Sequence, residues 1–122
     1  MIRRIKINVT ASGTDGSATG SATTPYGLHG LLKAIYVNHS AGANTTDFTV
    51  ATGDPARTIM AKADSVTDAW FYPGVQRTDA AGAAISGAYG DVPLNGDLLT
   101  ASLAQANDTQ TAAVTVVWDD LR

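Results

Sequence analysis

Cysteine and glutamate are both absent from this chain of 122 residues. Without cysteine there are no disulfides, thiolate metal sites or cysteine nucleophiles. All 11 acidic residues are aspartates. Aspartate is frequent in turns because its short side chain accepts hydrogen bonds from nearby backbone amides. We therefore expect most of the acidic residues to have structural roles.

Charge is also scarce, at 16% of the residues, and the formal net charge is −3. Binding to nucleic acid over a broad surface needs clustered Lys and Arg, and the one basic cluster, Arg3, Arg4 and Lys6, is interleaved with isoleucines. No apolar run approaches the ~20 residues of a membrane span, and the first ten residues lack the apolar core of a secretory signal. We expect neither nucleic acid nor membrane as a partner. The product should stay in the cytoplasm of the cell that makes it, unless it leaves within a larger particle.

Several short segments alternate apolar and polar residues, the period of a half-buried strand. Strands are predicted in this way over Ile5–Ala11, Phe48–Thr52, Thr58–Ala63 and Ala112–Trp118. Gly30–His39 is almost continuously apolar, which predicts a strand buried on both faces. Leu98–Leu103 fits either a short helix or a strand, and the flanking strands favour a strand.

Turn residues separate these segments at intervals of about 8–12 residues, the spacing of a β-sandwich or small barrel. The chain is therefore predicted to be all-β: an antiparallel β-sandwich, with a jelly roll as first choice and an immunoglobulin-like sandwich as the alternative. Its length suits one domain over residues 1–122. Residues 1–25 are expected to form an extended N-terminal strand or hairpin arm, with Ser17–Thr24 returning alongside the first strand after the turn at Gly13–Gly16.

Three aromatic residues stand together at Trp70, Phe71 and Tyr72. Side chains alternate along a strand, so Trp70 and Tyr72 should point one way and Phe71 the other. Aromatic residues on sandwich strands are usually part of the core, and we expect this of Trp70, Tyr72 and Trp118. The alternative is a carbohydrate-binding platform, which requires exposed rings.

The segment Gln76–Gly90 is rich in Ala and Gly and has no clear period. It is predicted to be an exposed loop with a reversal at Asp79–Gly82. Long loops on rigid β-scaffolds often carry partner contacts. The candidate partner contacts are Arg3, Arg4, Lys6, Arg77 and Asp79.

No catalytic or metal-binding motif emerges from the remaining residues. His29 and His39 are ten residues apart on one predicted strand, roughly 33 Å when extended, too far to share a metal ion. No G-x-S-x-G motif singles out a serine. The neighbouring carboxylates of Asp119 and Asp120 should face opposite sides of a strand. Carboxylates of Asp15, Asp47, Asp54 or Asp108 could help to hold a calcium ion, but none of these residues lies in the D-x-[DN]-x-[DN]-G spacing. We expect a protein that is not an enzyme, with no catalytic residue, cofactor or metal.

Four segments resemble small structural proteins of tailed bacteriophages that are encoded among head or tail genes. They are GLLKAIYVNHS (Gly30–Ser40), TTDFTVATGDPARTI (Thr45–Ile59), DAWFYPGVQRTDAAG (Asp68–Gly82) and AAVTVVWDD (Ala112–Asp120). No functional residue is transferred, because the resemblance contains no catalytic or binding motif. It implies a virion component: a capsid decoration or cement protein that binds the major capsid protein and other copies of itself, as a dimer or trimer. A tail component, or a receptor- or carbohydrate-binding module, is the alternative.

Overall fold

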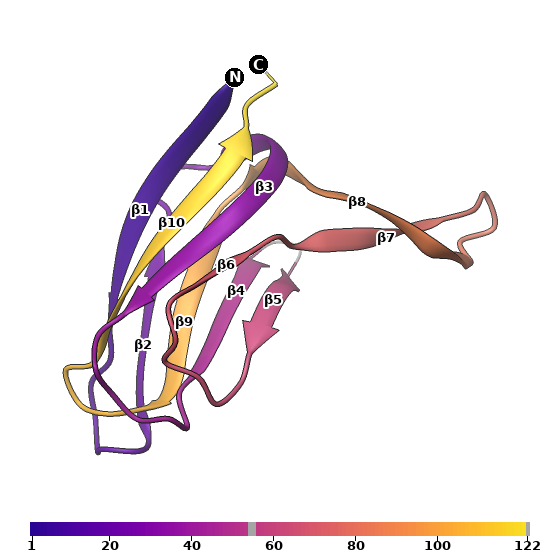
Figure 1. Cartoon of the computed structure of the whole chain (residues 1–122). Helices are drawn as coiled ribbons and strands as arrows, with labels where there is room; N and C mark the ends of the chain where they lie inside the picture. Colours follow the sequence, from indigo (N-terminus) through magenta and orange to yellow (C-terminus); the bar gives the residue numbers. More distant parts are fainter. Residues whose placement is uncertain (54–55, 122) are drawn as a thin grey trace.

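The computed structural model describes residues 1–53 and 56–121, and this part of the chain forms ten β-strands (Figure 1). Their bounds are β1 (Ile2–Thr10), β2 (Ala18–Thr23), β3 (Leu28–His39), β4 (Asp47–Gly53), β5 (Ala56–Lys62), β6 (Ala69–Phe71), β7 (Gly74–Thr78), β8 (Ala84–Asp97), β9 (Leu99–Ala106) and β10 (Thr111–Asp119). Within the described residues, no helix is long and apolar enough to cross a membrane.

The strands form two antiparallel sheets. The first has the order β1-β10-β3-β8-β7, with β6 also paired to β3, and the second has the order β2-β9-β4-β5. Their apolar faces share one core, so the predicted antiparallel β-sandwich is confirmed. The pairing is nested: β1 pairs with β10, β2 with β9, β3 with β8 and β4 with β5. Successive pairs in this series belong to alternate sheets.

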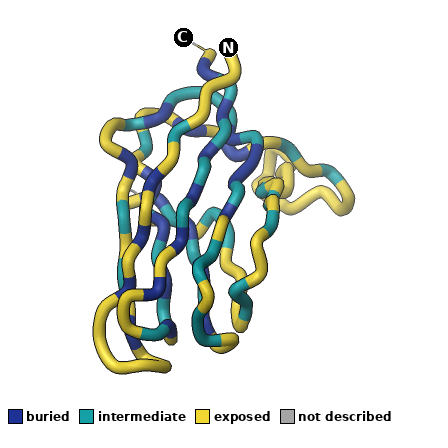
Figure 2. Tube along the Cα trace, turned by 60° about the vertical axis from the view of Figure 1, so that its left-hand side comes forward, coloured by how far each residue is buried: buried dark blue, intermediate teal, exposed yellow. Residues whose placement is uncertain are grey.

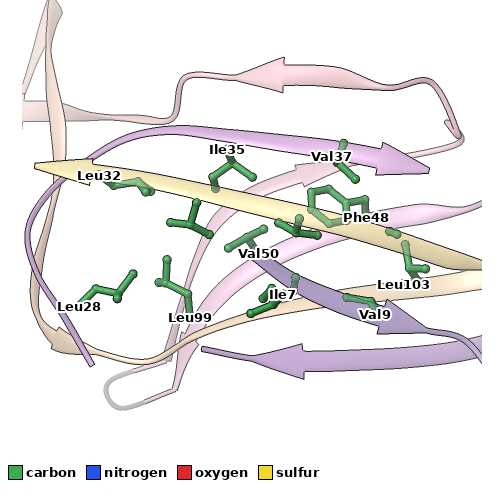
Figure 3. Packing of buried hydrophobic residues seen from close by; sticks show 14 of the residues in the cluster. Ile7, Val9, Leu28, Leu32, Ile35, Val37, Phe48, Val50, Leu99 and Leu103 are labelled. Atoms are coloured by element: carbon green, nitrogen blue, oxygen red, sulfur yellow. The ribbon is translucent and has the colours of Figure 1, made fainter. Parts of the chain in front are cut away.

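The core is built from alternate residues of both sheets (Figure 3). Ile7 and Val9 of β1 point inward from the first sheet, and Phe48 and Val50 of β4 point inward from the second. Leu99–Ala106 is a strand in which Leu99, Ala101 and Leu103 are buried at every second position, so the strand prediction for Leu98–Leu103 is confirmed. Strand β3 is fully buried mainly on its inner face. Its outer residues apart from the buried Ala34 are half-buried or exposed, so burial on both faces was an overestimate.

The predicted hairpin at the N-terminus is wrong. Strand β1 pairs with β10 along its whole length, whereas β2 pairs with β9 in the other sheet. The bridge between Ser12 and Thr19 connects the two segments at their turn. Ala11 and Ala18 are both buried there. The segment therefore crosses from one sheet to the other and closes this edge of the sandwich instead of forming an arm.

The predicted loop at Gln76–Gly90 is also wrong, because this segment is a β-hairpin. The C-terminal half of β8 pairs with β3 in the sandwich, from Leu32↔Val92 to Leu28↔Asp97. Its N-terminal half pairs with β7 and projects away from the body (Figure 1). Residues 74–91 of this hairpin are called the arm below. The segment has no apolar period in its sequence, but the residues on either side of its reversal are extended and pair with each other.

Candidate functional site

The arm is exposed over its whole length. None of residues 74–91 is buried, and most are exposed (Figure 2). Its apolar side chains include Val75, Ile85 and Tyr89, and Tyr89 is 65% exposed. A two-stranded ribbon with both faces in water is at best marginally stable on its own. The arm therefore presents apolar surface that a partner could cover.

The end of the arm is a reversal organised by Asp79, as the sequence predicted. The Asp79 amide donates to the carbonyl of Ala83 (2.9 Å), and the Gly82 amide donates to the carbonyl of Asp79 (3.0 Å). The Asp79 carboxylate accepts hydrogen bonds from the amides of Ala81 and Ala83 at 2.9 and 3.0 Å. The structure thus gives this candidate contact residue a local role in shaping the turn.

A large bulge bends the arm near its end. Val75 pairs with Gly90 and Gln76 with Tyr89, but the next pair is Thr78 with Ala84. Gly87 lies in this bulge with φ +77°, a conformation that favours glycine. Bulges disrupt the hydrogen-bonding edge of a strand and so discourage indiscriminate pairing with other strands. The faces of the arm, more than its hydrogen-bonding edge, are suited to recognition.

Three aromatic residues form a second exposed feature at the base of the arm, and Tyr36, Trp70 and Tyr72 are called the aromatic strip below. Tyr36 of β3 pairs with Trp70 of β6, and their ring centroids are 4.9 Å apart. The rings of Trp70 and Tyr72 are 6.5 Å apart and inclined by only 12°. Trp70 is 49% exposed and Tyr72 is 74% exposed.

The aromatic strip confirms one prediction and overturns another. Phe71 points the opposite way, toward the core, where its ring lies 6.5 Å from that of Phe48. The expected core position is correct for Trp118, which is 2% exposed, but wrong for Trp70 and Tyr72. The reason is that β6 belongs to the first sheet through its pairing with β3, and only the face that carries Phe71 packs against the core.

Charged groups lie at both ends of the aromatic strip. Lys33 forms an ion pair with Asp91 where the arm leaves the sheet. The hydrogen bond to Asp91 is the main reason that the pKa of Lys33 is raised. At the other end, the Asp68 carboxylate accepts a 2.7 Å hydrogen bond from the backbone amide of His39.

The basic residues near the N-terminus divide between the two faces of β1. Ile5 and Ile7 point inward, so Arg4 and Lys6 lie on the outer face of the first sheet. Lys6 pairs with Thr115 across the sheet, Thr115 pairs with Tyr36, and Tyr36 pairs with Trp70. These four residues therefore form one row across the first sheet. Arg3 instead forms an ion pair with Asp120, and the Nε atom of Arg3 lies 3.3 Å from the Asp120 carboxylate.

The titratable residues do not converge on a common centre. His29 and His39 lie near opposite ends of β3, as expected from their spacing. Among the described residues, no group of three or more His or Asp side chains is arranged to hold a metal ion. The loop aspartates Asp15 and Asp108 accept backbone hydrogen bonds. Asp47 does the same with the amide of Asp64, and Asp54 lies outside the described residues.

The partner contacts proposed from the sequence include Arg77 and Asp79, which lie on the arm, but not Tyr36 or Tyr89. The sequence did contain a signal for Tyr36. It stands between Ile35 and Val37 on one strand, so its side chain should point to the opposite face of the sheet from theirs. Nothing in the sequence distinguished Tyr89 from a core aromatic. No protein-family model matches the chain, and no curated protein or solved structure matches it.

Proposed function

We propose that this chain is a non-enzymatic structural subunit of a virus particle, a decoration or cement protein of a tailed-phage head. The observation that carries the proposal is the arm: an exposed, weakly charged hairpin with apolar side chains that projects from the sandwich (Figure 1). Only Arg77 and Asp79 are charged between residues 75 and 90. Such a surface suits burial against another protein, because interface cores are depleted of charge and enriched in aromatic residues.

The strand pairing supports the finer fold assignment that accompanies this proposal. Nested pairs that alternate between two four-stranded sheets are the arrangement expected when a long hairpin is rolled into a jelly roll. On this assignment β6, β7 and the first half of β8 are additions between the fifth and sixth strands of the roll. Jelly rolls occur in viral capsid proteins and in lectins, so the fold is compatible with the proposal without deciding it.

A cement protein stabilises a shell by burying surface across junctions between capsid subunits, and this needs no chemistry. The arm would extend the reach of one sandwich beyond its own footprint. Arg4 and Lys6, on the outer face of the first sheet, would pair with acidic groups of the major capsid protein. The location that follows is the virion, after synthesis in the host cytoplasm.

The test is cosedimentation with purified heads of the virus whose genome encodes the chain. We expect saturable binding to assembled heads and none to the unassembled major capsid protein, since the junctions exist only in the shell. A matched variant, in which Val75–Gly90 is replaced by a two-residue Asn-Gly turn, should bind much more weakly. Absence of binding by the intact protein to heads would reject the proposal.

A second candidate function is favoured by the exposure of Trp70 and Tyr72. Aromatic rings in this position can stack on the apolar faces of sugars, as in a receptor-binding module of a tail. Titration with a panel of glycans would shift the fluorescence of Trp70 on this hypothesis. A Trp70→Phe variant, which retains buried Trp118, should lose that shift.

A further inference from the structure

We propose that the arm of one molecule packs on the aromatic strip of a second copy of this chain. This inference rests on the proposed function, in which the arm is an assembly element, and it names the partner of that arm. The proposed contact involves the two features that a closed sandwich would lack: the projecting arm and the exposed rings of the aromatic strip.

The first argument is that neither surface is satisfied within one chain. The arm projects away from the body (Figure 1), and Trp70 and Tyr72 stay largely exposed at its base. Every copy carries one arm and one strip, so the two surfaces are present in equal numbers. Contacts between unlike surfaces of identical chains can close into a symmetric ring, and a two-fold axis would form two such contacts at once.

The second argument is complementarity of shape. The arm is dominated by small residues between Asp79 and Gly90, where eight of the twelve positions are Ala or Gly in the run DAAGAAISGAYG and only Ile85 and Tyr89 are large and apolar. Flat aromatic rings pack closely against backbone that lacks large side chains. Tyr and Trp are also the residues that most often dominate binding energy at the centre of an interface.

The third argument is complementarity of charge. Arg77 is the one cation of the arm, and it forms no ion pair with any described residue. Asp68 lies four residues before Tyr72, roughly 13 Å along an extended chain, and Arg77 lies three residues after Gly74, where the arm begins, roughly 10 Å. An arm that begins beside Tyr72 of a second copy and runs along the strip therefore brings Arg77 close to that copy's Asp68. The Lys33–Asp91 pair at the other end is already neutralised.

The first experiment measures the mass of the protein in solution by light scattering over a concentration series. We expect an oligomer for the natural chain, and a monomer for the Asn-Gly arm replacement and for Trp70→Ser. Tyr26→Ser is the matched control, because Tyr26 is 50% exposed but belongs to neither surface, and it should remain oligomeric. Circular dichroism confirms that each variant is folded.

The second experiment reverses the charges. Arg77→Asp and Asp68→Arg should each weaken association about tenfold or more, because each places like charges opposite one another. The double variant carrying both changes should recover most of the association. Recovery would not be expected if Asp68→Arg acted only by removing the hydrogen bond to the His39 amide, and lack of recovery would therefore count against the inference.

The inference and the proposed function fail separately. A natural chain that is monomeric at its highest soluble concentration overturns the arm–strip contact, whatever its binding to heads. An oligomer unaffected by the arm replacement or by Trp70→Ser overturns it as well. A glycan that binds the strip of the folded monomer would identify a different occupant and also overturn it. Conversely, an arm-dependent oligomer that does not bind heads supports this inference and rejects the proposed function.

Discussion

The side-chain amide of Gln110 donates a 2.9 Å hydrogen bond to the hydroxyl of Thr46, and both residues are buried. The Thr46 hydroxyl donates in turn to the carbonyl of Ala43. The side-chain oxygen of Gln110 accepts hydrogen bonds from the amides of Ala43 (3.1 Å) and Asn107 (2.9 Å). One glutamine therefore ties the connection between β9 and β10 to the connection between β3 and β4.

Replacing this glutamine should destabilise the fold strongly. Gln110→Ala leaves the amides of Ala43 and Asn107 without their acceptor and removes the hydrogen bond that the Thr46 hydroxyl accepts, so we expect the free energy of unfolding to fall by about 2–3 kcal/mol. Urea denaturation measures the change. Gln76→Ala, on the exposed arm, is the matched control and should cost no more than about 0.5 kcal/mol. Equal effects of the two substitutions would contradict a structural role for the Gln110 network.

Gly30 is predicted to be intolerant of any side chain. Its φ is +116°, and a Cβ atom built on it would lie 1.8 Å from the carbonyl oxygen of Asp119 on the neighbouring strand. Gly30→Ala must therefore push β3 away from β10, and we expect a loss of about 3 kcal/mol or more. Gly53→Ala is the control, because no atom of the described residues lies within 4 Å of a Cβ at that position. Thermal unfolding of both variants tests the contrast, and a Gly30→Ala protein as stable as the control would refute it.

The sandwich could be predicted from the sequence because its signal is local. Val114, Val116 and Trp118 are buried at every second position, and this alternation is visible in the chain without knowledge of its partners. The choice of strand for Leu98–Leu103 succeeded for the same reason. Pairing was harder, because small polar strands such as Ala18–Thr23 match several neighbours equally well. Its true partner, β9, is distant in sequence.

The candidate site was predicted only in part, because exposure depends on what the rest of the fold leaves uncovered. The sequence placed Trp70 and Tyr72 on one side and Phe71 on the other, but not which side meets the second sheet. It marked the reversal at Asp79 without showing that the flanking residues pair. An Ala- and Gly-rich ribbon has no apolar period to reveal it, since neither face packs on a core.

His39 should make the protein less stable in acid. Burial lowers the pKa of its imidazole from the ordinary value of 6.5, and the nearby Asp68 carboxylate opposes this only in part. The Nδ1 atom is buried and has no hydrogen-bond partner among the described residues, and the ring meets the edge of Phe48. The unfolded chain therefore binds this proton more readily than the folded protein.

The resulting loss of stability begins as the pH falls through about 6.5 and levels off below the lowered pKa of the folded state. The free energy of unfolding, measured by urea denaturation from pH 7.5 into the acid range, should show this loss. An NMR titration of the His39 ring reports the pKa of the folded state. In His39→Gln this part of the pH dependence should disappear. If the ring titrates above 6.5 in the folded protein, the sign of the prediction is wrong.

The two halves of β8 should contribute very differently to stability. Leu94 is 4% exposed in the half that pairs with β3, whereas no residue of the arm is buried. Leu94→Ala should therefore cost about 3 kcal/mol through lost burial and the cavity left behind. Replacing Val75–Gly90 with Asn-Gly should change the stability of the monomer by less than about 1 kcal/mol, because it removes only solvent-exposed contacts. Comparing both proteins at low concentration by urea denaturation excludes any contribution from association. A large loss on shortening the arm would mean that the arm supports its own sandwich, which would leave less reason to assign it to a second molecule.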